Sequence, residues 1–270
     1  MPTPWVTIEK GAAPAASGLN SQLASLFDAP AAERTWTHIS ASQLGMFKRC
    51  PNQYRERYIR GIKERPGAAL IWGSADHSAH EHNFRQKIES EKDLPVGDVT
   101  DAFDQAWRDR IDQAGGASQI EWDGDPDDMK TQAARLVEAY HHQASPMVQP
   151  IAVEREISLQ LPGVRLPIKG YIDVETTNSI VERKTGKRKV SSISDKPDWG
   201  LQGVIYSAAL DKPVFWHQAV KTKVPAVHVE GVYLDAPTEV AKRILAKDAQ
   251  QTIEMIDHFM ALYGPDEAWP

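Results

Sequence analysis

One segment of this sequence, residues 168–184, constrains the fold more than any other, because it has the pattern of two strands joined by a polar turn. Successive side chains of a strand point to opposite faces, so Glu182 and Lys184, two residues apart, share a face. A hairpin would bring both of them close to Asp173 on the first strand. Two carboxylates and one ammonium group suit a divalent cation and a nearby nucleophilic water. The pattern therefore predicts a metal site for hydrolysis at one end of a sheet.

The composition excludes several other classes of protein. With 270 residues, of which 41% are hydrophobic and 25% charged, the chain has the make-up of an ordinary globular protein. No apolar run approaches the roughly 20 residues that span a bilayer, and the first residues lack the pattern of a signal peptide. The single cysteine, Cys50, cannot form an internal disulfide and fits a reducing compartment. We therefore expect a cytoplasmic protein with no membrane partner.

The distribution of charge is uneven along the chain. The formal net charge of −6 argues against a protein that coats nucleic acid through its overall charge. Basic residues are nevertheless concentrated directly after the hairpin, at Lys187, Arg188 and Lys189. Such a local cluster is compatible with a nucleic-acid contact beside an acidic metal site.

The order of the predicted elements indicates the fold class. We expect residues 1–34, rich in Ala, Pro, Ser and Gly, to form a flexible tail and residues 35–270 to form a single domain. The helical part of this domain covers about 37–145, its strands lie at about 150–235, and a last helix covers about 237–262. This order predicts an α/β (α+β) protein with a central mixed β-sheet flanked by helices.

Two further pairs of residues flank the hairpin at helical spacing. Gly73 and His77 lie four residues apart upstream of it. Gln202 and Tyr206 lie four residues apart downstream, so each pair occupies one face of a predicted helix. The charges of the hairpin alone would be a weak indication of function, because surface hairpins commonly carry such residues. The order of the three motifs makes the functional interpretation stronger.

Taken together, these motifs resemble those of the PD-(D/E)XK nuclease superfamily, and within it the RecB-like exonuclease branch to which CRISPR adaptation nucleases are similar. The resemblance extends over about residues 37–210. The matching residues, in four motifs, are Ser40, Ser42, Leu44, Phe47, Cys50, Pro51 and Tyr54; Gly73 and His77; Gly170, Asp173, Glu182, Lys184, Thr185 and Gly186; and Gln202 and Tyr206. The resemblance implies a restriction-endonuclease-like core with an N-terminal helical part.

The resemblance also implies the parts of an active site. The metal ligands that it implies are His77, Asp173, Glu182 and the backbone carbonyl of Arg183. The catalytic residues that it implies are Lys184, Asp173, Glu182, Gln202 and Tyr206. The DNA-binding residues that we expect are Lys187, Arg188, Lys189, Trp199 and Tyr54. One or two ions of Mg²⁺ or Mn²⁺ are expected, and an imidazole ligand favours Mn²⁺ because nitrogen donors suit transition metals.

Other cofactors fit the sequence less well. Iron–sulfur members of the family hold their cluster with four cysteines, whereas this chain has only Cys50, so we expect no iron–sulfur cluster. A zinc site at His77, His80 and His82 is disfavoured, because His82 would point away from the other two on a helix. The acidic residues of 123–128 lack the glutamate that closes a calcium loop, and they indicate a solvated turn.

The function that we expect is that of a divalent-metal-dependent DNA nuclease, which hydrolyses phosphodiester bonds in DNA recombination, repair or phage DNA metabolism. An exonuclease is favoured because the sequence contains no separate module for reading a DNA sequence. Its partners would be single-stranded DNA or duplex ends, together with recombination or replication proteins. Two alternatives stay open. One is a structure-specific or restriction-type endonuclease, and the other is a non-catalytic subunit that binds DNA or a protein partner.

Overall fold

The computed structural model describes residues 36–270, and the tail expected over residues 1–34 lies outside the described residues. Within the described part, the strands form one seven-stranded sheet. The strands are β1 (Ile39–Ser40), β2 (Ala152–Leu159), β3 (Ile168–Glu175), β4 (Ile180–Gly186), β5 (Val214–Val220), β6 (Ala226–His228) and β7 (Tyr233–Leu234). Because this sheet contains both parallel and antiparallel pairs and carries helices around it, the expected α/β fold class is confirmed.

The sheet is organised around β3. Strand β2 runs antiparallel along one edge of β3, and the other edge is shared by β1, which is parallel, and β4, which is antiparallel. Strand β4 pairs in parallel with β5 along its whole length. The short strands β6 and β7 both pair antiparallel with β5 and complete the sheet.

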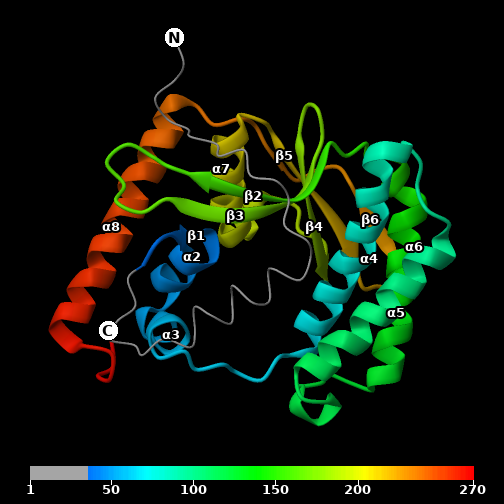
Figure 1. Ribbon diagram of the computed structural model, residues 1–270, viewed down its shortest axis with the longest axis horizontal. Helices are drawn as coiled ribbons and strands as arrows, with labels where there is room; N and C mark the ends of the chain where they lie inside the picture. Colours follow the sequence, from blue (N-terminus) through cyan, green and yellow to red (C-terminus); the bar gives the residue numbers. More distant parts are fainter. Residues whose placement is uncertain (1–35) are drawn as a thin grey trace.

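Helices pack around this sheet and account for most of the remaining residues within 36–270. They are α2 (Ala41–Arg49), α3 (Pro51–Tyr54), α4 (Ala68–Ser90), α5 (Val96–Gln113), α6 (Pro126–Gln143), α7 (Pro197–Leu210) and α8 (Glu239–Tyr263), with a π-helical turn at Arg55–Ile59. Figure 1 shows α4, α5 and α6 packed together at one end of the sheet and α8 at the opposite end. The helices α4 and α6 contact one face of the sheet, and α7 contacts the other.

Side chains of β3 and β4 contribute to a core on each face of the sheet. Ile172 and Ile180 belong to the larger core, which they form with residues of α7 and α8. Val174 and Val181 point the other way, into a smaller core with residues of α4 and α6. The neighbours Ile180 and Val181 face opposite layers, as the alternation along β4 requires. Ile172 and Val174 are two residues apart and yet face different layers, so the alternation along β3 is interrupted at Asp173.

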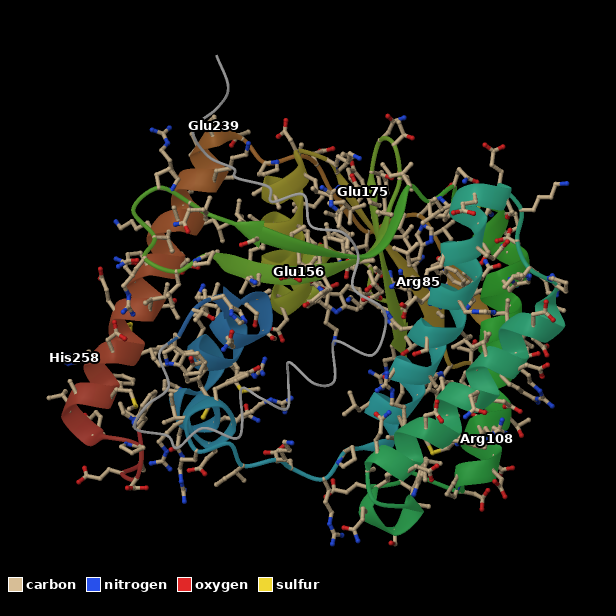
Figure 2. The ribbon with its side chains drawn as sticks, in the orientation of Figure 1. Arg85, Arg108, Glu156, Glu175, Glu239 and His258 are labelled. Atoms are coloured by element: carbon tan, nitrogen blue, oxygen red, sulfur yellow. The ribbon has the colours of Figure 1, made fainter. Side chains whose placement is uncertain are left out.

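Charged side chains lie on the outer surfaces of the helices. Arg108 on α5 and both Glu239 and His258 on α8 are exposed (Figure 2). The apolar residues of these helices recur at helical spacing and face the interior, as in amphipathic helices of globular proteins. No helix within residues 36–270 combines the length and the apolar character that crossing a bilayer would require.

The hairpin of β3 and β4 is paired only next to its turn. Val174 pairs with Val181 and Glu175 pairs with Ile180, and the two strands diverge beyond these residues. Further along β3, the same edge is taken by β1. The divergence begins at the level of Asp173, so that the side chains of the candidate site lie where backbone hydrogen bonds between the two strands have ceased.

Candidate active site

The carboxylates of Asp173 and Glu182 bridge the two diverging strands. The backbone N–H of Asp173 donates a hydrogen bond to Glu182 Oε1 over 3.2 Å. In return, the backbone N–H of Arg183 donates to Asp173 Oδ2 over 2.7 Å. These two backbone N–H groups would pair with the opposite strand in a regular hairpin. Here side-chain carboxylate oxygens accept their hydrogen bonds instead. The two acidic residues are held in fixed positions by the strands that carry them.

Lys184 completes the group on this face of β4. Its Nζ donates to Glu182 Oε2 over 3.1 Å, and its side chain is 21% exposed, whereas Glu182 is fully buried. Burial and the neighbouring Asp173 carboxylate raise the pKa of Glu182 to about 7, although Lys184 opposes the rise. Burial lowers the pKa of Lys184, but the carboxylates of Glu182 and Asp173 outweigh it and leave the pKa above its ordinary value. The structure therefore brings Asp173, Glu182 and Lys184 together around a charged lysine.

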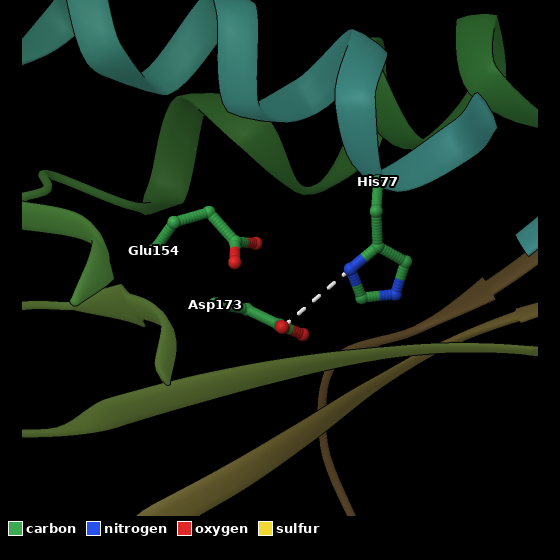
Figure 3. Close-up of side chains that lie close together, drawn as sticks. All are labelled: His77, Glu154 and Asp173. Atoms are coloured by element: carbon green, nitrogen blue, oxygen red, sulfur yellow. Dashed lines mark ion pairs between the residues drawn. The ribbon is translucent and has the colours of Figure 1, made fainter. Parts of the chain in front are cut away.

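His77 reaches the same site from α4 (Figure 3). Its Nδ1 lies 3.5 Å from Asp173 Oδ1, and its Nε2 lies 3.1 Å from the carbonyl oxygen of Arg183. Burial lowers the pKa of His77, yet the Asp173 carboxylate more than offsets this effect and the pKa is raised. The same interaction lowers the pKa of Asp173 to well below its usual range, although burial acts in the opposite direction. The imidazole thus stands between the acidic site and the backbone of β4.

Glu154 on β2 is a member of the site that the sequence analysis did not identify. It lies opposite Asp173, since Val153 pairs with Val174 and Arg155 pairs with Ile172 on either side. Its backbone has a φ of 49°, in the left-handed region that residues other than glycine rarely adopt. Its carboxylate is directed towards Asp173 and the His77 imidazole (Figure 3). Burial, followed by the charge of Asp173, raises the pKa of Glu154 to about 8.

Gln202 and Tyr206 lie on α7, one turn apart. Gln202 Nε2 donates a hydrogen bond to the Tyr206 hydroxyl over 3.1 Å. The Tyr206 ring packs directly on Gly170 of β3, where a Cβ atom would lie only 2.6 Å from Tyr206 Cε1. Burial raises the pKa of Tyr206 strongly, and the Glu182 carboxylate adds to this effect, so the hydroxyl is neutral. The pair therefore borders the acidic site from the α7 side of the sheet.

The basic cluster that follows β4 lies at the surface. Lys187, Arg188 and Lys189 are all exposed. Lys187 forms an ion pair with Asp123 over 2.8 Å, and both side chains are largely open to solvent. Surface pairs of this kind contribute little to stability, so the Lys187 ammonium can exchange its partner for another anion.

The two aromatic residues expected to contact DNA have different surroundings. Trp199 is partly buried and its ring is stacked on that of Trp216, with centroids 6.5 Å apart. Tyr54 is 1% exposed and packs in the core against Trp269 near the C-terminus. Because the Tyr54 ring has no surface open to solvent, the expectation that it contacts DNA is withdrawn.

The donor set of the site fits a divalent cation. His77, Glu154 and Asp173 each offer one ligand atom, and these atoms all lie within 4.8 Å of one another. Two carboxylate oxygens and one imidazole nitrogen are a donor set for Mg²⁺ or, with the nitrogen, for Mn²⁺. Glu182 lies beside this group, but its oxygens accept hydrogen bonds from Asp173 and Lys184.

Comparison with known protein families shows the class of protein to which the chain belongs. The sequence profile of the PD-(D/E)XK nuclease superfamily matches residues 38–262, and the chain belongs to this superfamily. No curated protein matches it. A solved structure of a candidate exonuclease from Eubacterium rectale is similar, with a TM-score of 0.56 and 14% identity over 92% of this chain and 86% of that one. At this identity the likeness concerns the fold. Membership of the superfamily implies a nuclease that uses divalent metal ions.

Proposed function

We propose that this chain is a deoxyribonuclease that requires Mg²⁺ or Mn²⁺ and degrades DNA from its ends, as a RecB-like exonuclease does. The observation that carries the proposal is the convergence of His77, Glu154 and Asp173 within 4.8 Å, next to the ammonium group of Lys184. Such a site combines cation ligands with a fixed positive charge, which is what hydrolysis of a phosphodiester requires.

His77, Glu154 and Asp173 are the residues that would hold the cation. Glu182 and the carbonyl oxygen of Arg183 are the further oxygen ligands that the sequence motif implies. A divalent ion in this position supplies a Lewis acid for the phosphodiester and makes water a stronger nucleophile at neutral pH. The choice between Mg²⁺ and Mn²⁺ follows from the imidazole, because a nitrogen ligand favours Mn²⁺.

Lys184 has the role of stabilising negative charge on the phosphate during hydrolysis. Its ammonium group is held in place by Glu182 over 3.1 Å and is partly exposed, so a phosphate oxygen can reach it. A preorganised charge aimed at the transition state contributes on the order of 3–4 kcal/mol in comparable sites. Gln202 and Tyr206, hydrogen-bonded to each other at the border of the site, are the residues that would orient the phosphate or the attacking water.

DNA binding is assigned to the exposed surface next to β4. Lys187, Arg188 and Lys189 follow the catalytic strand directly, where they can neutralise backbone phosphates. Trp199 is partly exposed on α7 and offers a ring for stacking with a base. We propose that substrates are single strands or duplex ends. The name of the similar structure, a candidate exonuclease, supports end-dependent cleavage.

The cellular setting that we propose is DNA recombination, repair or phage DNA metabolism in the cytoplasm, with recombination or replication proteins as partners. The family, the expected end-dependent cleavage and the single cysteine of the chain support this setting. These finer assignments depend on the substrate, which is the first property to measure.

The experiment compares end-labelled linear duplex DNA, linear single-stranded DNA, closed circular DNA and RNA, each with Mn²⁺ or Mg²⁺. Linear DNA should be degraded and closed circles should stay intact, and the Asp173→Asn protein should be inactive on all of them. Cleavage of closed circles would assign the chain to the endonucleases. Cleavage of RNA alone would contradict a deoxyribonuclease. Equal activity of the Asp173→Asn protein would contradict the proposed site.

A further inference from the structure

A buried ion pair joins α4 to β4 directly behind the candidate site. The guanidinium of Arg183 donates from Nη2 to Asp76 Oδ2 over 2.8 Å and from Nη1 to the backbone carbonyl of Asp76 over 3.3 Å. The Arg183 side chain is 4% exposed and that of Asp76 is fully buried. On β4, Arg183 alternates with Glu182 and Lys184, so its side chain points to the opposite face of the strand.

The surroundings of this pair are poorly suited to stabilising the fold. Within residues 36–270, Arg183 Nε and Asp76 Oδ1 have no hydrogen-bond partner. Both ring nitrogens of the neighbouring His80, which is also fully buried, lack a hydrogen-bond partner in the same part of the chain, and His80 Nε2 lies 3.8 Å from Asp76 Oδ1. Burying two charges is costly, and the cost is repaid only when all their remaining polar atoms are hydrogen-bonded. Buried polar atoms without hydrogen bonds in a native protein call for an explanation, such as a bound water, a strained arrangement or a role in function.

The pair is connected to the candidate site on both sides. Asp76 is followed directly by His77 in α4. The backbone of Arg183 contacts two of the proposed ligands, because its N–H donates to Asp173 Oδ2 over 2.7 Å and its carbonyl oxygen lies 3.1 Å from His77 Nε2. The ion pair fixes β4 relative to α4. If Arg183 moved relative to α4, the position of Asp173 relative to His77 would therefore change.

A second helix holds the guanidinium in place. The Arg183 guanidinium lies over the ring of Tyr140 on α6, 4.1 Å from the ring centroid. The Tyr140 hydroxyl is hydrogen-bonded to His217 Nδ1 on β5 over 2.9 Å. Stacking and hydrogen bonding thus hold Arg183 from two directions, so it has one well-defined position. A lysine would not reproduce this arrangement, since it lacks the planar fork of donors.

We infer that the Asp76–Arg183 ion pair is a positioning device, which sets the separation of the His77 imidazole and the Asp173 carboxylate and thereby the affinity of the site for a divalent cation. This inference rests on the proposed function in one respect, that His77 and Asp173 are cation ligands. Asp76 and Arg183 act through these ligands: the side chains of the pair point away from the face that carries Glu182 and Lys184.

The test replaces the whole pair with apolar residues of similar size, in the variant Asp76→Leu/Arg183→Met. Because replacing a buried ion pair by well-packed apolar residues is often neutral or stabilising, the melting temperature without metal should equal or exceed that of the wild type. Titration calorimetry with MnCl₂ alone should nevertheless show an affinity at least tenfold lower. Cleavage should require a correspondingly higher Mn²⁺ concentration and recover when that concentration is raised.

The matched control removes another largely buried ion pair, which α4 forms with the segment that follows it. Lys87 near the end of α4 pairs with Asp93 over 2.8 Å, and its side chain is 4% exposed. Lys87→Met/Asp93→Leu should leave Mn²⁺ affinity within about twofold of the wild type, whatever its effect on the melting temperature. A tenfold loss in this control would assign the effect to general loosening of α4 and overturn the inference.

Two further variants separate the possible outcomes. Arg183→Lys keeps the buried charge, so it tests the inference if the double variant does not fold, and its Mn²⁺ affinity should also fall. Wild-type Mn²⁺ affinity in a folded variant of either kind would overturn the positioning role. A loss of cleavage that added Mn²⁺ does not relieve would also overturn it.

Asp173→Asn tests the proposed function itself. If it binds Mn²⁺ like the wild type, the failure lies with the assigned ligands and not with the Asp76–Arg183 pair.

Discussion

Glu154 and Asp173 lie directly opposite each other on neighbouring strands, and Glu154 occupies this position with a backbone φ of 49°. Burial and the Asp173 charge raise the pKa of Glu154 to about 8, so ionising both carboxylates at this position is destabilising. A left-handed conformation costs a residue with a side chain a further 1–3 kcal/mol or so. Both costs fall on Glu154, and both bring its carboxylate towards His77 and Asp173 (Figure 3). A cation bound by these three residues would favour the ionised form of Glu154 and offset the repulsion between the two carboxylates.

The first prediction concerns Glu154. Glu154→Gln removes a carboxyl group whose ionisation burial and the Asp173 charge oppose, so we expect the free energy of unfolding without metal to stay the same or to rise by about 1 kcal/mol. Mn²⁺ affinity should fall by at least tenfold, because one of the three ligands is lost. Urea denaturation without metal and calorimetric titration with Mn²⁺ measure the two effects.

The control for this prediction lies two residues further along β2. Glu156→Gln removes a carboxylate that is paired with Lys169 at the surface, over 3.0 Å. Its Mn²⁺ affinity should match that of the wild type. If Glu154→Gln binds Mn²⁺ as tightly as Glu156→Gln does, Glu154 is not a ligand.

The residues that the sequence could predict are those whose position depends on a local period. Asp173, Glu182 and Lys184 meet because side chains alternate along two strands joined by a short turn. Gln202 and Tyr206 are adjacent because they are one helical turn apart, and the structure connects them by a hydrogen bond. The α/β fold class follows in the same way from the order of helical and strand patterns.

The residues that the sequence could not predict depend on long-range packing. Glu154 enters the site through the register between β2 and β3 and through an unusual backbone angle, neither of which a local pattern determines. Tyr54 lies on an apolar helix face, and such a face predicts burial or a binding surface equally well. Its burial results from contact with Trp269, more than two hundred residues away in the chain, with ring centroids 6.3 Å apart.

The second prediction concerns the close packing of Gly170 against Tyr206. An alanine Cβ at Gly170 would lie 2.6 Å from Tyr206 Cε1, so Gly170→Ala has to displace a ring that is 5% exposed. We expect a loss of about 1–3 kcal/mol in the free energy of unfolding, which is typical of overpacking. Cleavage should also slow, since displacing Tyr206 breaks its hydrogen bond with Gln202.

A glycine elsewhere serves as the control for this substitution. A Cβ built at Gly97 in α5 meets no described atom within 4 Å, so Gly97→Ala should be neutral or slightly stabilising. Combining Gly170→Ala with Tyr206→Leu should restore stability but not the rate of cleavage. Full wild-type stability of Gly170→Ala alone would mean that the Tyr206 ring is free to move.

The third prediction separates a catalytic lysine from a DNA-binding one. Lys184→Met should lower the single-turnover rate of DNA cleavage by on the order of 100-fold or more, because a preorganised charge next to the scissile phosphate is lost. Lys187→Met removes an exposed ammonium that forms a surface ion pair with Asp123, so DNA affinity should weaken and the rate at saturating enzyme should change little. Single-turnover cleavage of an end-labelled strand measures both. Equal rates for the two variants would remove Lys184 from the reaction.

The last prediction concerns the pH dependence of stability and rests on His217. This residue is 7% exposed, and burial together with the Arg183 charge lowers its pKa from 6.5 to about 4. As the pH falls below 6.5, the unfolded chain takes up a proton at this residue while the folded protein does not. The free energy of unfolding should therefore decrease between pH 6.5 and pH 4, by up to about 3 kcal/mol for this group, and its share should be constant above and below that window.

His217→Gln isolates this contribution, because glutamine does not titrate and can still accept a hydrogen bond from the Tyr140 hydroxyl. Burial also lowers the pKa of His80, but His80 is present in both proteins and its effect cancels in the difference. Urea denaturation without metal at several pH values should give the two proteins parallel stabilities above pH 7. Below that pH the wild type should lose stability more steeply than His217→Gln. Identical slopes down to pH 4 would mean that His217 binds its proton as readily in the folded protein as in the unfolded chain, which would contradict its burial beside the Arg183 charge.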